Sequence, residues 1–166
     1  MRNLVYLSLG SNVGNREQHL RDAIARLAAE GRVVSVSSFY ETEPVEFTEQ
    51  AWFLNCAIAY ETDRGAEELM AALLGMEKEM GRERTQEKGP RTIDIDILLL
   101  GEAVVNSAEL TIPHPAMQGR RFVLEPLAEI APEARHPVLW KTVRELRDAL
   151  PAGQAVRRVP VKRNHQ

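Results

Sequence analysis

The stretch Thr92-Ile93-Asp94-Ile95-Asp96-Ile97-Leu98-Leu99-Leu100 decides the fold class, because its two faces differ in chemistry. β-Branched residues at this density favour a β-strand. Side chains alternate along a strand, so the two aspartates share one face, about 7 Å apart. The residues expected on the opposite, core-facing side are Ile93, Ile95, Ile97 and Leu99. Such a strand belongs in a sheet with a buried face and a polar, open face.

The segments before this strand give the order β-α-β-β-α-β. Apolar periodicity predicts strands at 4–9, 33–40 and 53–61, and helices between Asn15 and Gly31 and between Gly65 and Gly81. The side chains expected on one face of the strand 53–61 are Leu54, Cys56, Ile58 and Tyr60. Those expected to form the apolar stripe of the second helix are Leu69, Leu73, Met76 and Met80. Asn15 and Gln18 form a capping-box pattern, and Gly31 is expected to end the first helix as C-terminal glycines usually do. We therefore expect an α+β protein with a ferredoxin-like antiparallel sheet and both helices on one face. The C-terminal additions expected after Gly101 are a short strand or hairpin and helical stretches near 121–130 and 140–149.

The composition is that of one folded domain, residues 1–166, with a tail at 160–166 expected to be disordered. Hydrophobic residues make up 44% of the chain, and the net charge of -3 argues against nucleic acid or an anionic membrane as its main partner. Cys56 is the only cysteine, which excludes an intramolecular disulfide and a cysteine-based zinc site. The sequence contains no signal-peptide pattern and no apolar run of about 18 residues. We expect a cytoplasmic monomer that acts on small molecules.

Arginines precede the two acids. Carboxylates at this spacing suit Mg²⁺, which binds through one or two carboxylates plus substrate phosphates. Arg82, Arg84 and Arg91 suit phosphate oxygens, so the combination indicates phosphoryl transfer. The alternative is that both acids and arginines are ordinary solvated charges. Because the loop 82–88 contains no apolar side chain, we expect it to be a lid that orders when a ligand with phosphate groups binds.

Two further groups of residues complete the candidate site. His114 stands between two prolines and shortly before Arg120, which makes it a candidate phosphate donor beside a metal and arginine site. Phe53 and Asn55 share the non-core face of their strand, and an aromatic ring beside an amide suits a flat heterocycle. The alternatives are a structural histidine and a half-exposed strand face.

Six sequence blocks together resemble the family of 6-hydroxymethyl-7,8-dihydropterin pyrophosphokinases. The blocks are LGSN (9–12), SFYETEPV (38–45), FLN (53–55), GPRTIDID (89–96), LTIPHP (110–115) and RRFVLEPL (120–127). The resemblance runs from Leu4 to about Pro132, and the shared order of the blocks makes it more specific than any single block.

The resemblance implies an enzyme that transfers the β,γ-diphosphate of ATP to the hydroxymethyl group of the pterin and releases AMP in folate biosynthesis. It implies two Mg²⁺ ions held by Asp94 and Asp96, which act in catalysis together with Arg82, Arg84 and Arg91. The residues implied to contact ATP are Glu77, Arg82, Arg84, Arg91, Ile97, Thr111, His114 and Arg120. Those implied to contact the pterin are Thr42, Val45 and Asn55 by hydrogen bonds, and Phe53 and Phe122 by stacking on its two faces.

Two positions depart from the family pattern: Lys88, where some relatives have an aromatic residue, and Ala116, where many are basic. No side chain is an obvious covalent nucleophile, so catalysis is expected to rest on positioning and charge stabilisation. Two other functions remain open from the residues alone. One is a palm-type nucleotidyltransferase, which would transfer AMP, and the other is a ferredoxin-like regulatory module that binds a nucleotide or metal without turnover.

Overall fold

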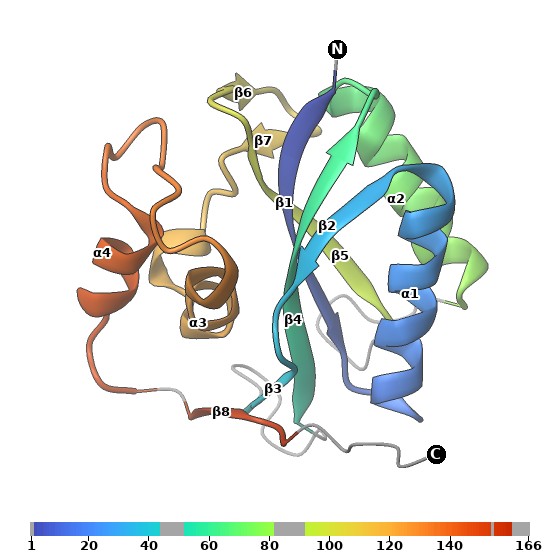
Figure 1. Ribbon diagram of the computed structural model, residues 1–166, viewed down its shortest axis with the longest axis horizontal. Helices are drawn as coiled ribbons and strands as arrows, with labels where there is room; N and C mark the ends of the chain where they lie inside the picture. The colour runs from blue at the N-terminus through green and yellow to red at the C-terminus, as the bar shows by residue number, and fades with distance from the viewer. Residues whose placement is uncertain (1, 44–51, 82–91, 154, 161–166) are drawn as a thin grey trace.

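The computed structural model describes residues 2–43, 52–81, 92–153 and 155–160, and confirms an α+β protein with an antiparallel sheet (Figure 1). The first half contains β1 (Asn3–Ser11), α1 (Arg16–Glu30), β2 (Arg32–Val36), β3 (Tyr40–Thr42), β4 (Phe53–Thr62) and α2 (Ala66–Glu79). The second half contains β5 (Asp94–Leu100), β6 (Val105–Asn106), β7 (Thr111–Ile112), the 3₁₀ turn η1 (Met117–Gly119), α3 (Arg121–Ile130), α4 (Val143–Asp148) and β8 (Val156–Arg158). The main sheet has the order β5-β1-β4-β3-β8, and β2 also pairs with β4.

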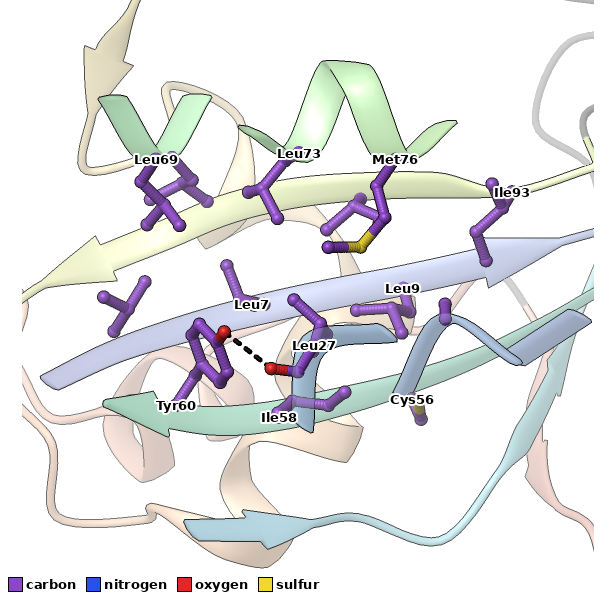
Figure 2. Close-up of a cluster of buried hydrophobic side chains, with 14 of the residues drawn as sticks. Leu7, Leu9, Leu27, Cys56, Ile58, Tyr60, Leu69, Leu73, Met76 and Ile93 are labelled. Atoms are coloured by element: carbon purple, nitrogen blue, oxygen red, sulfur yellow. Dashed lines mark hydrogen bonds between the residues drawn. The ribbon is translucent and has the colours of Figure 1, made fainter. Parts of the chain in front are cut away.

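Helices α1 and α2 cover one face of the sheet and bury the main hydrophobic core. Their apolar stripes meet the strand residues that alternation assigned to the core face, including Cys56, Ile58 and Tyr60 of β4 (Figure 2). The predicted stripe of α2 is confirmed, because Leu69, Leu73 and Met76 are buried and Met80 is partly buried. Burial of a large apolar side chain contributes about 1.5–3 kcal/mol, so this layer supplies much of the stability.

The sequence had led us to expect that the second face of the sheet is open, but part of this face is covered. Helices α3 and α4 lie on that side (Figure 1), where Leu124 and Leu127 of α3 join a second cluster with Ala57 and Leu99 of the sheet. The strongly amphipathic sequence of α3 explains this, since its apolar side needs a partner surface. The polar end of the face, around Asp94, remains outside this cluster.

The strand that decides the fold contains an irregularity that alternation did not predict. The register of β1 against β5 shifts between Tyr6, which pairs with Leu99, and Leu7, which pairs with Ile97. Leu98 has no partner in β1 and is therefore the extra residue of a β-bulge. A β-bulge reverses the facing of the residues that follow it. The prediction that Leu99 points into the main core was therefore wrong, and its side chain lies in the second cluster.

The single strand predicted at 33–40 is two strands, β2 and β3. Between them, the Ser37 hydroxyl accepts a hydrogen bond from the Ala57 N–H at 2.8 Å, and the Ser38 N–H donates to the Glu129 carboxylate at 3.0 Å. Side chains thus satisfy backbone groups that a continuous ladder would use, and the regular ladder with β4 is interrupted between β2 and β3.

Helix α1 begins and ends at the predicted residues, Asn15 and Gly31, but the interactions there differ in part from those expected. The Asn15 side chain accepts a hydrogen bond from the backbone N–H of Gln18. The side-chain amide of Gln18 donates to Asp22 and not back to Asn15, so only half of the capping box forms. Gly31 ends the helix with φ -169°, which is extended backbone. A glycine is required at this position because there is no space for a side chain. A Cβ would lie 2.7 Å from the Glu61 carbonyl oxygen and closer still to the Tyr60 hydroxyl.

Two further findings complete the fold. Strand β8, which pairs with β3, has no counterpart in the elements expected from the sequence. Within the described part of the chain, no helix combines the length and apolar character needed to cross a membrane. The tail expected at 160–166 lies outside the described residues except for Pro160.

We predict that Gly31→Ala destabilises the protein by about 1–3 kcal/mol, because the new methyl group displaces the Tyr60 ring. That ring is fixed by its hydroxyl, which donates to the Leu27 carbonyl at 2.7 Å (Figure 2). Urea unfolding measures the change. Gly75→Ala is the matched control, because Gly75 is an exposed position in α2 with open space around it and should gain roughly 0.5–1 kcal/mol. Equal effects of the two substitutions would contradict the steric explanation.

Candidate active site

Strand β1 brings predicted site residues from two other strands to one level of the sheet. Gly10 pairs with Asn55 of β4 on one side and with Asp94 of β5 on the other. Directly paired residues point to the same face, so the amide and the carboxylate flank a residue without a side chain. One pleat further, Ser8 pairs with Asp96. The two predicted groups, acids and heterocycle contacts, therefore share one face.

Asn55 is held in a fixed orientation by a buried hydrogen bond. Its Oδ1 accepts from the Thr42 hydroxyl at 2.7 Å, and its Nδ2 makes a long contact of 3.5 Å with the Leu9 carbonyl oxygen. Both Thr42 and Asn55 are buried. Because Oδ1 is already engaged, the Nδ2 end of the amide is the one better able to offer a hydrogen to a ligand.

Gly10 makes this arrangement possible, a role that the sequence did not suggest. A Cβ at Gly10 would lie 2.6 Å from Asn55 Nδ2 and 3.6 Å from Phe53 Cδ1. Thus the amide lies over the strand backbone in space that any larger residue would fill. Phe53, partly buried at the start of β4, contacts the same space.

The two aspartates differ in burial, and the backbone between them is anchored from behind. Asp94 is half-buried and Asp96 is exposed. From the opposite face, the buried Glu77 of α2 accepts a hydrogen bond from the Ile95 N–H at 2.7 Å. Its hydrogen bond to Ile95 fixes the strand that carries the acids, and the contact of Glu77 with a nucleotide stays a prediction.

The residues present fit a magnesium site that is completed by a ligand. Within the described ranges, no group of three or more His, Cys, Asp and Glu side chains gathers that could hold a metal by itself. Two carboxylates on one face nevertheless suit Mg²⁺, since waters and phosphate oxygens usually fill the rest of its octahedral shell. Asp94 and Asp96 are the side chains that would supply the protein ligands.

His114 lies next to the acidic strand and is held as a neutral donor. Its backbone N–H donates to the Leu98 carbonyl of β5 at 3.0 Å, which places the loop that contains His114 beside that strand. Its ring Nδ1 accepts from the Ala116 N–H at 3.1 Å, so in the neutral ring the hydrogen is carried by Nε2. Burial, followed by the nearby Arg120 charge, lowers the pKa of His114 below its usual value of 6.5. The ring can therefore donate one hydrogen bond from Nε2 at neutral pH.

The remaining predicted residues lie on α3, β7 and β5, or outside the described residues. Arg120, at the start of α3, has its guanidinium 5.5 Å from the centre of the Phe122 ring, and Thr111 lies half-buried in β7. The Ile97 side chain is buried in the main core, so a ligand at the acids' face would meet this residue only through its backbone. Four predicted residues lie outside the described residues: Val45, Arg82, Arg84 and Arg91. The loop 82–88 expected to be a lid, and with it Lys88, also falls there.

A carboxylate on α3 that the sequence did not single out ties this helix to β3. Glu129 accepts from the Tyr40 hydroxyl at 2.6 Å and from the hydroxyl and N–H of Ser38. Burial alone would raise the pKa of Glu129, but these hydrogen bonds hold it below its ordinary value. The residues are about ninety positions apart, so no local pattern could have revealed the contact.

A cavity of about 340 Å³ lies apart from the candidate site. It is lined by residues from the early part of β1, the end of β5 and the loop before α4, including Tyr6, Leu99 and Trp140. None of the predicted site residues lines it. The candidate site is consequently defined by the paired strands and not by this cavity.

Comparisons with known proteins agree on one family. A family model described as 7,8-dihydro-6-hydroxymethylpterin-pyrophosphokinase (HPPK) matches residues 6–132. The 2-amino-4-hydroxy-6-hydroxymethyldihydropteridine pyrophosphokinase of Bacillus subtilis is 47% identical over 132 residues, 78% of this chain and 79% of that protein. The protein of the same name from Methylorubrum extorquens is 44% identical over 142 residues, 84% of this chain and 89% of its own.

Other relatives are much longer than this chain. The folic acid synthesis protein FOL1 of Dictyostelium discoideum is 39% identical over 158 residues, which is 95% of this chain but only 24% of that protein. The crystal structure of Plasmodium falciparum HPPK-DHPS with pteroate superposes with a TM-score of 0.71 over 89% of this chain and 42% of that one. At 16% sequence identity, this second likeness supports the fold alone.

We predict that Gly10→Ala destabilises the protein by about 1–3 kcal/mol, because the buried, hydrogen-bonded Asn55 has to move. Urea unfolding of Gly10→Ala, Asn55→Ala and the double variant tests the cause. In the Asn55→Ala background the methyl group has room, so Gly10→Ala should cost almost nothing further. Additive losses in the double variant would show that Asn55 is not the group displaced.

We also predict that His114 titrates below 6.5 and carries its hydrogen on Nε2 when neutral. Because the unfolded chain takes up this proton at higher pH than the folded one, His114 stabilises the protein fully above about 6.5, and the contribution falls as pH drops towards the folded pKa. Nitrogen-15 NMR of the imidazole ring measures both tautomer and midpoint. A midpoint above 6.5, or a hydrogen on Nδ1, would contradict this assignment.

Proposed function

Because this chain belongs to the 7,8-dihydro-6-hydroxymethylpterin-pyrophosphokinase family, we propose that it transfers the β,γ-diphosphate of ATP to 6-hydroxymethyl-7,8-dihydropterin. The products are AMP and the pterin diphosphate, an intermediate of folate biosynthesis. The observation that carries the proposal is the family match over residues 6–132, which includes Gly10, Asn55, Asp94 and Asp96 of the paired strands and all of α3.

The reaction needs positioning more than covalent chemistry. The hydroxymethyl oxygen attacks the β-phosphorus and loses its proton, while the bond from that phosphorus to the bridging oxygen of AMP breaks. Both substrates must lie in line, and the charge on the phosphate oxygens must be balanced. The face shared by Asn55, Asp94 and Asp96 suits this task, since it presents a heterocycle contact and a cation site side by side.

On the phosphate side, Asp94 and Asp96 would hold Mg²⁺, two ions in our proposal, which supply positive charge to the ATP phosphates when bound. His114 donates from Nε2 and Arg120 adds a guanidinium next to it. Arg82, Arg84 and Arg91 would complete the set as ligands of the migrating phosphates. Glu77 fixes the strand between the two acids, and Thr111 and the backbone of Ile97 would line the nucleotide.

On the pterin side, the Thr42–Asn55 pair would read the polar edge of the ring, with Val45 adding a further contact. The hydrogen bond between them orients the amide before the ligand arrives, so little entropy is lost on binding. Phe53 and Phe122 would stack on the ring's two faces. Preorganisation of this kind favours selectivity, because an analogue lacking the matching edge leaves a buried amide unpaired.

The proposal extends to the protein's organisation. The order β5-β1-β4-β2 with α1 and α2 on one face supports a ferredoxin-like core, to which β6, β7, α3, α4 and β8 would be C-terminal additions. We propose a single domain over residues 1–166 that acts as a cytoplasmic monomer without nucleic-acid or membrane partners.

Product analysis tests the function directly. Incubation with ATP, Mg²⁺ and the pterin should release AMP in amounts equal to the pterin diphosphate, as measured by chromatography and phosphorus NMR. Release of ADP or transfer of AMP to the substrate would replace the proposal with a monophosphate kinase or a nucleotidyltransferase. Absence of turnover would favour a binding module.

We predict that Asp96→Asn keeps the fold but lowers kcat/KM by roughly a thousandfold or more, because one carboxylate ligand is lost. Asp96 is exposed, so the substitution opens no core cavity. Asp63 provides the control Asp63→Asn, because it is exposed, lies 3.9 Å from Arg2 and follows the end of β4 that is remote from Asn55. Wild-type turnover of Asp96→Asn at low Mg²⁺ would remove this residue from the metal site.

A further inference from the structure

The C-terminal strand β8 lies beside β3 and reaches the pterin side of the proposed site from outside the family match (Figure 1). Val156 pairs with Thr42, and Arg157 and Arg158 pair with the two residues before it. The family model ends at residue 132. Strand β8 therefore lies beyond the part of the chain that the family model covers.

Arg157 completes a chain of charges across three elements. Its guanidinium donates to Oε1 of Glu41 at 2.9 and 3.1 Å, while Arg16 of α1 donates to Oε2 of the same carboxylate at 2.8 Å. Hydrogen bonds from Arg16, then from Arg157, hold the pKa of Glu41 below its ordinary value. Thus α1, β3 and β8 are tied together at the residue that precedes Thr42.

The same two arginines also fix the residue that precedes Phe53. Arg16 donates to the Trp52 carbonyl at 2.8 Å, and the Arg157 guanidinium lies 5.1 Å from the centre of the Trp52 ring. Strand β3 and the start of β4 are directly paired here, with Thr42 opposite Phe53. Arg157 consequently contacts the neighbours of both residues without reaching the pterin face itself.

The segment before β8 adds a second link. The Glu43 N–H donates to the Ala155 carbonyl at 3.3 Å, and the Ala155 N–H donates back to the Glu43 carboxylate at 2.9 Å. Thr42 is thus bracketed by Glu41 and Glu43, each bound to the C-terminal strand or its approach. Without these contacts β3, only three residues long, would be an edge strand with one paired side.

We propose that Arg157 is a positioning residue for pterin binding, acting through Glu41 and Trp52 to keep Thr42, Asn55 and Phe53 in register. This inference rests on the proposed function. A purely structural role explains less, because the Arg157 side chain is 70% exposed and an exposed ion pair adds little to the free energy of unfolding. Its effect should instead appear in the geometry of the strands that it connects.

Arg157→Ala tests the inference, with Arg32→Ala as matched control. Arg32 is 65% exposed and pairs with Glu61, which lies in β4 at the end remote from Phe53. Both variants should unfold within a few degrees of wild type. In Arg157→Ala, KM for the pterin should rise about five- to tenfold with KM for ATP nearly unchanged, because only the pterin contacts shift. Arg157→Lys should restore part of the affinity, since it retains the charge opposite Glu41.

Hydrogen exchange without ligands gives an independent readout. Arg157→Ala should accelerate exchange at 40–43 and 52–55 and leave 58–62 unchanged, whereas Arg32→Ala should not affect 40–43. Unchanged exchange and an unchanged pterin KM in an active Arg157→Ala enzyme would overturn the inference and leave the proposed function intact. If the wild-type protein neither binds nor converts the pterin, the proposed function fails and the inference with it.

Discussion

The pairing of β1 with β4 on one side and β5 on the other is the constraint on which the candidate site depends. Gly10 has the Asn55 amide and the Asp94 carboxylate as direct neighbours because all three occupy one row of an antiparallel sheet. Residues in such a row lie about 5 Å from strand to strand, whatever their separation in sequence. The ladder therefore fixes the distance between the heterocycle contact and the acids. A shift of one residue in either register would turn one of them to the opposite face.

The two faces of the sheet divide structural and chemical tasks. The face under α1 and α2 is almost entirely apolar and gives the sheet its stability. On the other face, α3 covers only part of the strands, and Arg120 and Phe122 stand at its start. Polar contacts fasten this second layer: Glu129 of α3 accepts hydrogen bonds from Tyr40 of β3 and from Ser38, two residues before it. The site is thus built where apolar cover ends, and charged groups there remain accessible to solvent and ligands.

Much of this architecture follows from local pattern. The acids' shared face, the core face of β4, the stripe of α2 and the Asn15 cap depend on periodicity or on neighbours within four residues, and each was predicted correctly. The errors have a common origin in contacts between distant segments. Leu99 changed face through a bulge in the β1–β5 register, and the strand expected at 33–40 was divided by Ser37 and by Glu129 from α3. The second face was expected to be open because nothing local in its strands announces the helix that covers it.

The sequence by itself determined the α+β class, the alternation that places Asp94 and Asp96 on one face, and, through its blocks, the family to which the chain belongs. These properties are carried by residue type and short spacing, which fix side-chain direction and chemistry. Only the tertiary structure decided that Gly10 leaves room for Asn55, that Glu77 anchors the backbone between the acids, and that Arg157 reaches Glu41. Those contacts join residues 18 to 116 positions apart. They arise only when strand register and layer packing bring the segments together, and no local preference of either partner encodes them.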